Sequence, residues 1–175
     1  MSDSNIEITY ITPPSSASEE IKAEILALYM NERDTWPNPS MVKIENALKH
    51  ALALGIVYYQ PEGDATATTA SSGETHEAKA VSTASTSKKL GGFILMTGAP
   101  NDPLLEDMII APSLRGKGLG VRLIKTTLEM EPFKSAPRVD LYCKGFLIPF
   151  YEKAGFSVVR RGDTPNDKGL MRIQR

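Results

Sequence analysis

The chain has 175 residues, of which 41% are hydrophobic and 23% charged, values typical of a globular domain and unlike those of disordered, collagen-like or coiled-coil chains. Its formal net charge of −1 argues against a general nucleic-acid-binding protein, and its single cysteine excludes an intramolecular disulfide. No apolar run approaches the roughly 20 residues needed to cross a bilayer, and the first residues lack the features of a signal peptide. We therefore expect a cytoplasmic protein with no membrane partner.

The charges are unevenly distributed along the chain. Residues 1–110 carry 7 Lys and Arg against 15 Asp and Glu, a net charge of −8, whereas residues 111–175 carry 13 against 6, a net charge of +7. This asymmetry is compatible with an anion bound by the C-terminal part and a cation bound near the N-terminal part. Two solvated faces that differ in charge would give the same pattern, and charge alone favours this second interpretation.

Hydrophobic periodicity predicts an alternation of strands and helices. A first strand at 6–11 is followed by a helix capped by Ser18 and, after a break, by a helix over about 41–54 capped by Ser40. Further strands are expected at 56–60, 90–96, 104–110, 139–143, 156–159 and 170–173, with helices at 117–130 and 147–154, the last of them ended by Gly155. The order predicts an α/β protein in which helices cover both faces of a mixed sheet.

Residues 62–89 differ in composition from the rest of the chain. Ala, Thr and Ser dominate this segment, and Val81 is its only large aliphatic residue. Such a stretch buries too little apolar surface to offset the cost of ordering it. We predict a long mobile loop that joins two neighbouring strands, so that residues 1–175 form a single domain with an insertion.

A glycine-rich turn connects the strand at 104–110 to the helix that follows it. Gly116, Gly118 and Gly120 occupy alternate positions, which lets the backbone approach a ligand and point successive N–H groups at it. The positive end of the helix dipole and the nearby basic side chains favour an anion, most naturally a phosphate or pyrophosphate. The spacing fits neither a Walker A loop nor the Rossmann fingerprint. A turn of this kind that binds nothing is the alternative.

The turn resembles the acetyl-CoA signature of the GNAT superfamily of N-acetyltransferases, [RQ]-x-x-G-x-[GA], with Arg115, Gly118 and Gly120 in the defining positions. A second block at 141–159, LYCKGFLIPFYEKAGFSVV, resembles the C-terminal block of the same superfamily and is most similar to arylalkylamine-type acetyltransferases. The resemblance covers about 104–160 well and the N-terminal half only in layout. It implies a GNAT-like fold with a twisted, mostly antiparallel mixed sheet of six or seven strands.

The resemblance implies acetyl-CoA as the donor substrate. Backbone N–H groups of the turn would hold its pyrophosphate, the backbones of Met108 and Ile110 would pair with its pantetheine arm, and the Met108 N–H would stabilise the developing oxyanion. No metal is expected, because the sequence has no cluster of His and Cys. The residues implied in donor binding are Met108, Ile109, Ile110, Arg115, Gly116, Lys117, Gly118, Leu119, Gly120, Val121, Lys144 and Tyr151.

Tyr151 matches the family position of the general acid that protonates the departing thiolate. A phenol has a reference pKa near 10 and is therefore protonated at neutral pH. The alternative is a tyrosine that only packs between helix and sheet. Lys144 stands where many members of the superfamily have an asparagine that contacts the CoA arm, which puts that contact in doubt. We expect Cys143, the only thiol, to pack and not to react.

Two acidic residues, Glu106 and Asp107, lie beside the expected thioester position, and strand alternation is expected to send them to opposite faces. The Leu-Glu-Asp pattern resembles spermidine and glucosamine-phosphate acetyltransferases. Either carboxylate could accept the amine proton through water or attract an ammonium group, and either could be a solvated strand-end charge. Tyr29 and Trp36 could line the acceptor pocket, although a Trp36 that closes the core is an equal alternative.

These features predict an N-acetyltransferase whose partners are acetyl-CoA and a small primary amine, such as an arylalkylamine, a polyamine or an amino sugar. The alternatives are an acetyltransferase for protein lysines or N-termini, and a catalytically silent CoA-binding regulatory module. The retained Tyr151 argues against the silent module. The sequence leaves the acceptor and the choice between monomer and homodimer open.

Overall fold

The computed structural model describes residues 5–32, 36, 38–61 and 88–175. Within these ranges seven strands form one sheet in the order β1-β2-β3-β4-β5-β7-β6, in which β4 and β5 are parallel and all other neighbours antiparallel. None of the helices in these ranges is both long enough and apolar enough to span a membrane. The elements are β1 (Ile6–Ile11), η2 (Pro14–Ser16), α1 (Glu19–Met30), α2 (Met41–His50), β2 (Ala53–Tyr59), β3 (Lys89–Ala99), β4 (Asp102–Ile110), η3 (Pro112–Leu114), α3 (Leu119–Leu128), β5 (Arg138–Lys144), η4 (Gly145–Leu147), α4 (Ile148–Lys153), β6 (Ser157–Arg160) and β7 (Lys168–Gln174).

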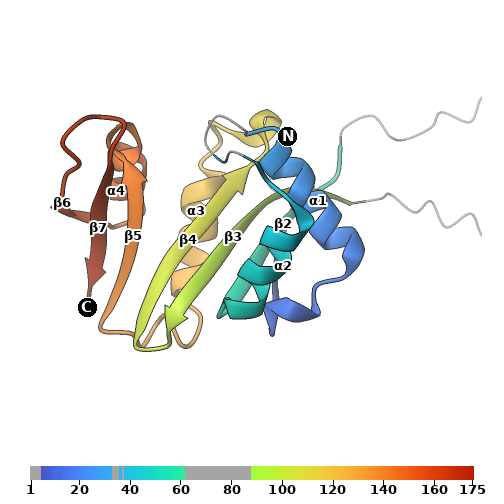
Figure 1. Cartoon of the computed structure of the whole chain (residues 1–175), viewed down its shortest axis with the longest axis horizontal. Coiled ribbons are helices and arrows are strands. Elements are labelled where there is room, and N and C mark those ends of the chain that lie inside the picture. The colour runs from blue at the N-terminus through green and yellow to red at the C-terminus, as the bar shows by residue number, and fades with distance from the viewer. Residues whose placement is uncertain (1–4, 33–35, 37, 62–87) are drawn as a thin grey trace, which may run out of the picture.

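The sheet separates two hydrophobic clusters, and the predicted mixed α/β architecture with helices on both faces is confirmed. Figure 1 shows α1 and α2 in front of the sheet and α3 behind it. Successive residues of β3 alternate between the clusters: Phe93 packs under α1 and α2, whereas Ile94 packs under α3. Because both of its faces are covered, β3 is apolar without interruption through its centre.

The two predicted N-caps are confirmed. The Ser18 side chain accepts a hydrogen bond from the Ile21 N–H at 3.3 Å, and the Ser40 side chain accepts one from the Lys43 N–H at 3.4 Å. The prediction for the second helix was wrong at its C-terminal end, because α2 ends at His50. The Leu52 N–H donates to the Met96 carbonyl of β3 at 2.7 Å, and β2 begins at Ala53, so pairing with β3 replaces the last helical turn.

Most of the predicted insertion at 62–89, namely residues 62–87, lies outside the described residues. The strands on either side of it are antiparallel neighbours, with Tyr59 paired to Lys89. The strands that flank the segment are therefore neighbours in the sheet. The predicted segment extends one residue too far at its C-terminal end, because β3 already begins at Lys89.

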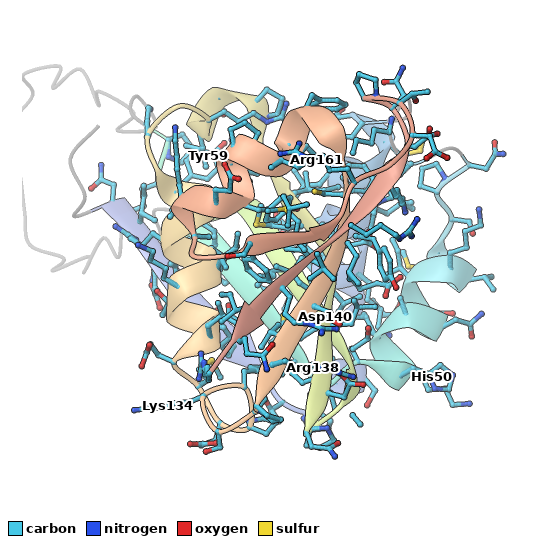
Figure 2. The ribbon with its side chains drawn as sticks, turned by 90° about the vertical axis from the view of Figure 1, so that its left-hand side faces the viewer. His50, Tyr59, Lys134, Arg138, Asp140 and Arg161 are labelled. Carbon is cyan, nitrogen blue, oxygen red and sulfur yellow. The ribbon has the colours of Figure 1, made fainter. Side chains whose placement is uncertain are left out.

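Strands β4 and β5 separate along their length. In the described chain they pair only at Leu104 with Asp140 and at Leu105 with Leu141, and they diverge beyond these residues (Figure 1). An ion pair links β5 to β4 at the paired region, where Arg138 donates to both oxygens of Asp102 at 2.9 and 3.0 Å. A second joins β7 to β5, where Arg172 donates to both oxygens of Asp140 at 2.7 Å. Figure 2 shows Arg138 and Asp140 together on β5. The C-terminal ends of both strands therefore border an opening in the middle of the sheet.

Candidate functional site

A β-bulge interrupts the pairing of β4 with β3, just beyond the residues at which β4 pairs with β5. Leu95 of β3 pairs with Asp107, but the next residue, Met96, pairs with Leu105, so Glu106 is an extra residue in β4. Leu105 belongs to the cluster under α3, whereas Asp107 faces α1. Strict alternation would put residues 105 and 107 on the same face. The bulge thus turns the acidic residue toward the N-terminal helices.

The expected placement of the two carboxylates on opposite faces is wrong. Glu106 is exposed and accepts a hydrogen bond from the Thr97 hydroxyl at 3.2 Å. Thr97 follows Leu95 by two residues on β3 and so shares its face, the face that Asp107 also occupies. The physical reason is the extra residue in the bulge, which allows two consecutive side chains to point to the same side.

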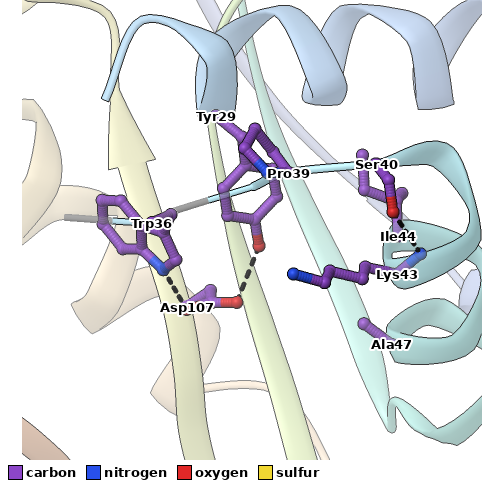
Figure 3. Close-up of a pocket in the computed structure, with 8 residues that line it drawn as sticks. All are labelled: Tyr29, Trp36, Pro39, Ser40, Lys43, Ile44, Ala47 and Asp107. Atoms are coloured by element: carbon purple, nitrogen blue, oxygen red, sulfur yellow. Dashed lines mark hydrogen bonds between the residues drawn. The ribbon is translucent and has the colours of Figure 1, made fainter. Parts of the chain in front are cut away.

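Asp107 is held by two donors from the N-terminal part of the chain (Figure 3). The Tyr29 hydroxyl donates to one carboxylate oxygen at 2.7 Å, and the Trp36 indole N–H donates to the other at 2.8 Å. The two rings meet edge to face with centroids 5.8 Å apart. Burial, with added contributions from the Asp107 charge and hydrogen bond, raises the pKa of Tyr29 well above its usual value, so this hydroxyl remains a donor. The structure therefore unites three of the predicted site residues.

These three residues border a cavity of about 200 Å³ between β4 and the first two helices. Its other walls come from α2 and the segment before it, which the sequence pattern assigned only to a core helix and a break. The amphipathic pattern of α2 was the one sequence signal for these lining residues. It indicates a helix that packs on the sheet, and a helix packed beside Asp107 also borders the cavity. The lining residues are Tyr29, Trp36, Pro39, Ser40, Lys43, Ile44, Ala47 and Asp107.

The glycine-rich turn joins the end of β4 to α3, which packs on the face of the sheet opposite the cavity, and its glycines differ in role. Gly116 and Gly118 have φ of +78° and +73°, and a Cβ built on either would meet no atom within 4 Å. Gly118 is also the N-cap of α3, so the unpaired N–H groups of the helix follow it directly. Gly120 instead allows close packing, because its Cβ would lie 3.0 Å from the Phe150 ring. The first two glycines therefore leave a backbone cradle open to an anion.

The other residues implied in acetyl-CoA binding are of two kinds. Some have side chains that are bonded within the protein, and others could contribute only backbone groups. Arg115 donates from Nε to the Ile110 carbonyl at 2.8 Å and forms an ion pair with Glu32 at the end of α1. This long-range link, which the sequence did not indicate, ties the turn to the residues that follow α1. The side chains of Ile109 and Leu119 are buried, so only backbone groups of these two residues could contribute to donor binding.

Beyond Leu105, the β4 edge that faces β5 has no strand partner in the described chain. The backbones of Met108 and Ile110 lie on this stretch, as required for pairing with an extended ligand arm. Val121, in the first turn of α3, packs partly buried against the core. Lys144 ends β5 with its ammonium 6.0 Å from the centre of the Phe146 ring.

Tyr151 lies in α4 within the cluster under α3 and is 8% exposed. Its ring meets Phe150 and Phe156 edge to face, with centroids 4.9 and 6.1 Å away. The described residues give its hydroxyl no hydrogen-bond partner, yet they contain no buried side-chain oxygen without one, so the hydroxyl reaches the molecular surface. Burial, with smaller contributions from Cys143 and Asp107, raises the pKa of Tyr151. The group therefore remains protonated and open to a ligand.

Cys143 behaves as a packed core residue, as the sequence predicted. It is 4% exposed, its Sγ lies 3.5 Å from the Met171 Sδ, and burial raises the pKa of its thiol. Among the residues that the structure describes, no group of three or more His, Cys, Asp or Glu side chains could hold a metal ion.

Comparison with known proteins gives a consistent picture. The family model described as acetyltransferase (GNAT) domain matches residues 62–173. A glucosamine 6-phosphate N-acetyltransferase of Trypanosoma brucei brucei is 40% identical over 57 residues, which are 33% of this chain and only 39% of that enzyme.

Solved structures share the fold at low sequence identity. The chain resembles the PaiA N-acetyltransferase of Thermoplasma acidophilum in complex with coenzyme A, with a TM-score of 0.61 at 18% identity over 97% of this chain and 99% of the other. It also resembles a chain of the NatC complex bound to Gag peptide and CoA, with a TM-score of 0.67 at 14% identity over 98% and 99% of the two chains. Because the family model matches well over half of the chain and the solved structures share its fold, the chain belongs to the GNAT acetyltransferase family.

Proposed function

We propose that the protein is an acetyl-CoA-dependent N-acetyltransferase that passes the acetyl group directly to a small primary amine. The observation that carries this proposal is the position of Asp107 at the β4 bulge. Its carboxylate faces an open cavity of about 200 Å³, while the next residue, Met108, lies on the unpaired edge of β4 that faces the donor side. In this proposal, two neighbouring residues of β4 serve the two substrates: Asp107 lies beside the acceptor, and Met108 lies beside the acyl donor.

Each reacting charge has a protein group beside it in this proposal. Asp107 attracts the ammonium form of the acceptor and receives its proton, directly or through water. The Met108 N–H donates to the negative charge that develops on the carbonyl oxygen. Tyr151, whose raised pKa keeps it protonated, donates to the departing thiolate. The cradle at Gly116 and Gly118 holds the pyrophosphate through backbone N–H groups.

The cavity supports a small acceptor over a protein. Its volume of about 200 Å³ is below the roughly 300–1,000 Å³ of typical ligand pockets, and α1 and α2 wall one side of it. The similarity to a glucosamine 6-phosphate N-acetyltransferase favours an amino sugar over an arylalkylamine or a polyamine. Release of free thiol from acetyl-CoA over a panel of amino sugars, arylalkylamines, polyamines and peptides tests this. Turnover of peptides alone would contradict a small acceptor, and CoA binding without turnover would indicate a silent module.

Replacing Gly118 by Ala is expected to weaken acetyl-CoA binding by at least about tenfold. The new methyl group would project into the open cradle, and the left-handed backbone would cost about 1–2 kcal/mol of stability. Titration calorimetry with CoA and thermal unfolding measure the two effects separately.

Gly155→Ala is the matched control for this prediction. Gly155 follows α4 with φ of +103°, and a Cβ there would make only an ordinary contact, 3.8 Å from Ile173. It should lose comparable stability and keep wild-type CoA affinity. Equal loss of CoA affinity in both variants would contradict the cradle.

A further inference from the structure

Lys43 places a positive charge in the acceptor cavity opposite Asp107. Figure 3 shows its side chain extending from α2 with the ammonium pointing toward Tyr29 and Asp107. The ammonium donates one hydrogen bond, at 2.8 Å, to the backbone carbonyl of Asn38. In the described part of the chain it forms no ion pair, and an ammonium has three donors. Two donors therefore remain for a ligand.

The position of Lys43 in its helix gives no structural reason for a lysine. It lies in the first turn of α2, directly after the Ser40 cap, where the positive end of the helix dipole disfavours a cation. The basic residues that suit the dipole, Lys49 and His50, lie in the last turn. The contact with the Asn38 carbonyl directs the ammonium of this exposed side chain toward the cavity.

The two charges define the kind of acceptor that fits between them. Asp107 attracts an ammonium group, but a second cationic group on the same molecule would be repelled by Lys43. A carboxylate or a phosphate monoester would accept hydrogen bonds from the two remaining donors of Lys43. We infer that the acceptor is a primary amine that also carries an anionic group, with Lys43 as the residue that selects for that group. This inference rests on the proposed function and narrows its substrate class.

Two matched acceptor pairs test the inference with the full-length protein and acetyl-CoA. Glucosamine 6-phosphate is compared with glucosamine, and phenylalanine with phenylalanine amide, so that the pairs distinguish a phosphate from a carboxylate. The wild type is expected to prefer the anionic member of at least one pair by tenfold or more in kcat/KM. Lys43→Met should reduce that preference ratio by about 10- to 100-fold, as expected for loss of a charge-assisted hydrogen bond.

Lys49→Met, which removes a lysine of the same helix outside the cavity, is the control and should leave the preference ratio unchanged. Thermal unfolding should show that both variants fold, because Met is a good helix former and Lys43 is exposed. The inference is overturned if the wild type prefers the uncharged member of both pairs, or if Lys43→Met leaves the preference ratio intact. Turnover of tyramine or spermidine but of neither anionic probe overturns the inference alone. Lack of turnover with every amine overturns the proposed function as well.

Discussion

Tyr151→Phe is expected to lower kcat by about 100-fold or more while the Kd for acetyl-CoA stays within about twofold of the wild type. The substitution keeps the ring and its edge-to-face contacts with Phe150 and Phe156, and removes only a hydroxyl that has no partner among the described residues. The fold should therefore be unaffected, and the loss should fall on the thiolate-protonation step. Single-turnover thiol release at saturating donor and acceptor measures it.

Tyr142→Phe is the control for this variant. Tyr142 is a half-exposed tyrosine on β5, and its substitution should leave kcat unchanged. Because burial raises the pKa of Tyr151, its acid form is retained as pH rises, so this residue should cause no fall in kcat below its ordinary pKa near 10. Wild-type turnover in Tyr151→Phe, or an equal loss in Tyr142→Phe, would refute the assigned role.

Asp107→Asn is expected to lower kcat/KM for the amine by about 100-fold, with the KM for acetyl-CoA unchanged. The substitution preserves shape but removes the charge that attracts the ammonium and accepts its proton. Stability should change by less than about 1 kcal/mol, because the new amide can still satisfy both neighbours. Its oxygen can accept from the Trp36 N–H, and its NH₂ can donate to the Tyr29 hydroxyl, which also accepts hydrogen bonds. Steady-state kinetics and thermal unfolding separate the two effects.

Glu106→Gln provides the matched comparison, since it neutralises the adjacent carboxylate in the same bulge. Glu106 is exposed and does not line the cavity, so its substitution should change kcat/KM by less than about threefold. A larger loss in Glu106→Gln than in Asp107→Asn would assign the proton acceptor to Glu106.

Local sequence signals were enough for most of the fold. Ser18 and Ser40 cap their helices as expected because the signal is chemical and short-range, a side-chain oxygen three residues before an unpaired N–H. The order of the elements followed from apolar periodicity and turn residues. The prediction failed at the end of α2 because the apolar spacing of a helix continues to residue 54. Residues 53 and 54 instead pair with β3, and this tertiary contact decides their structure.

The candidate site was predictable only in part. The open turn at Gly116 and Gly118 has a local signature, since both residues have a positive φ, a conformation that favours glycine. The bulge at Glu106 does not, because it exists only relative to the register of β3. The placement of Lys43 in the cavity and the pairing of Arg115 with Glu32 depend on how distant helices pack on the sheet. Such contacts are set by the tertiary fold and not by any local pattern.

The division of the site between the two halves of the chain has a consequence for how such proteins diversify. The helices that wall the cavity, α1 and α2, precede β4 in the chain, whereas the open turn and Tyr151 follow it, and Asp107 of β4 itself lines the cavity. Under the proposed function, substitutions in α1 and α2 are therefore expected to alter which amines are accepted without disturbing the residues proposed to handle the acyl donor. Recombination that exchanges these two helices between relatives would be an efficient route to new acceptors, provided that the partner for Arg115 at the end of α1 is retained.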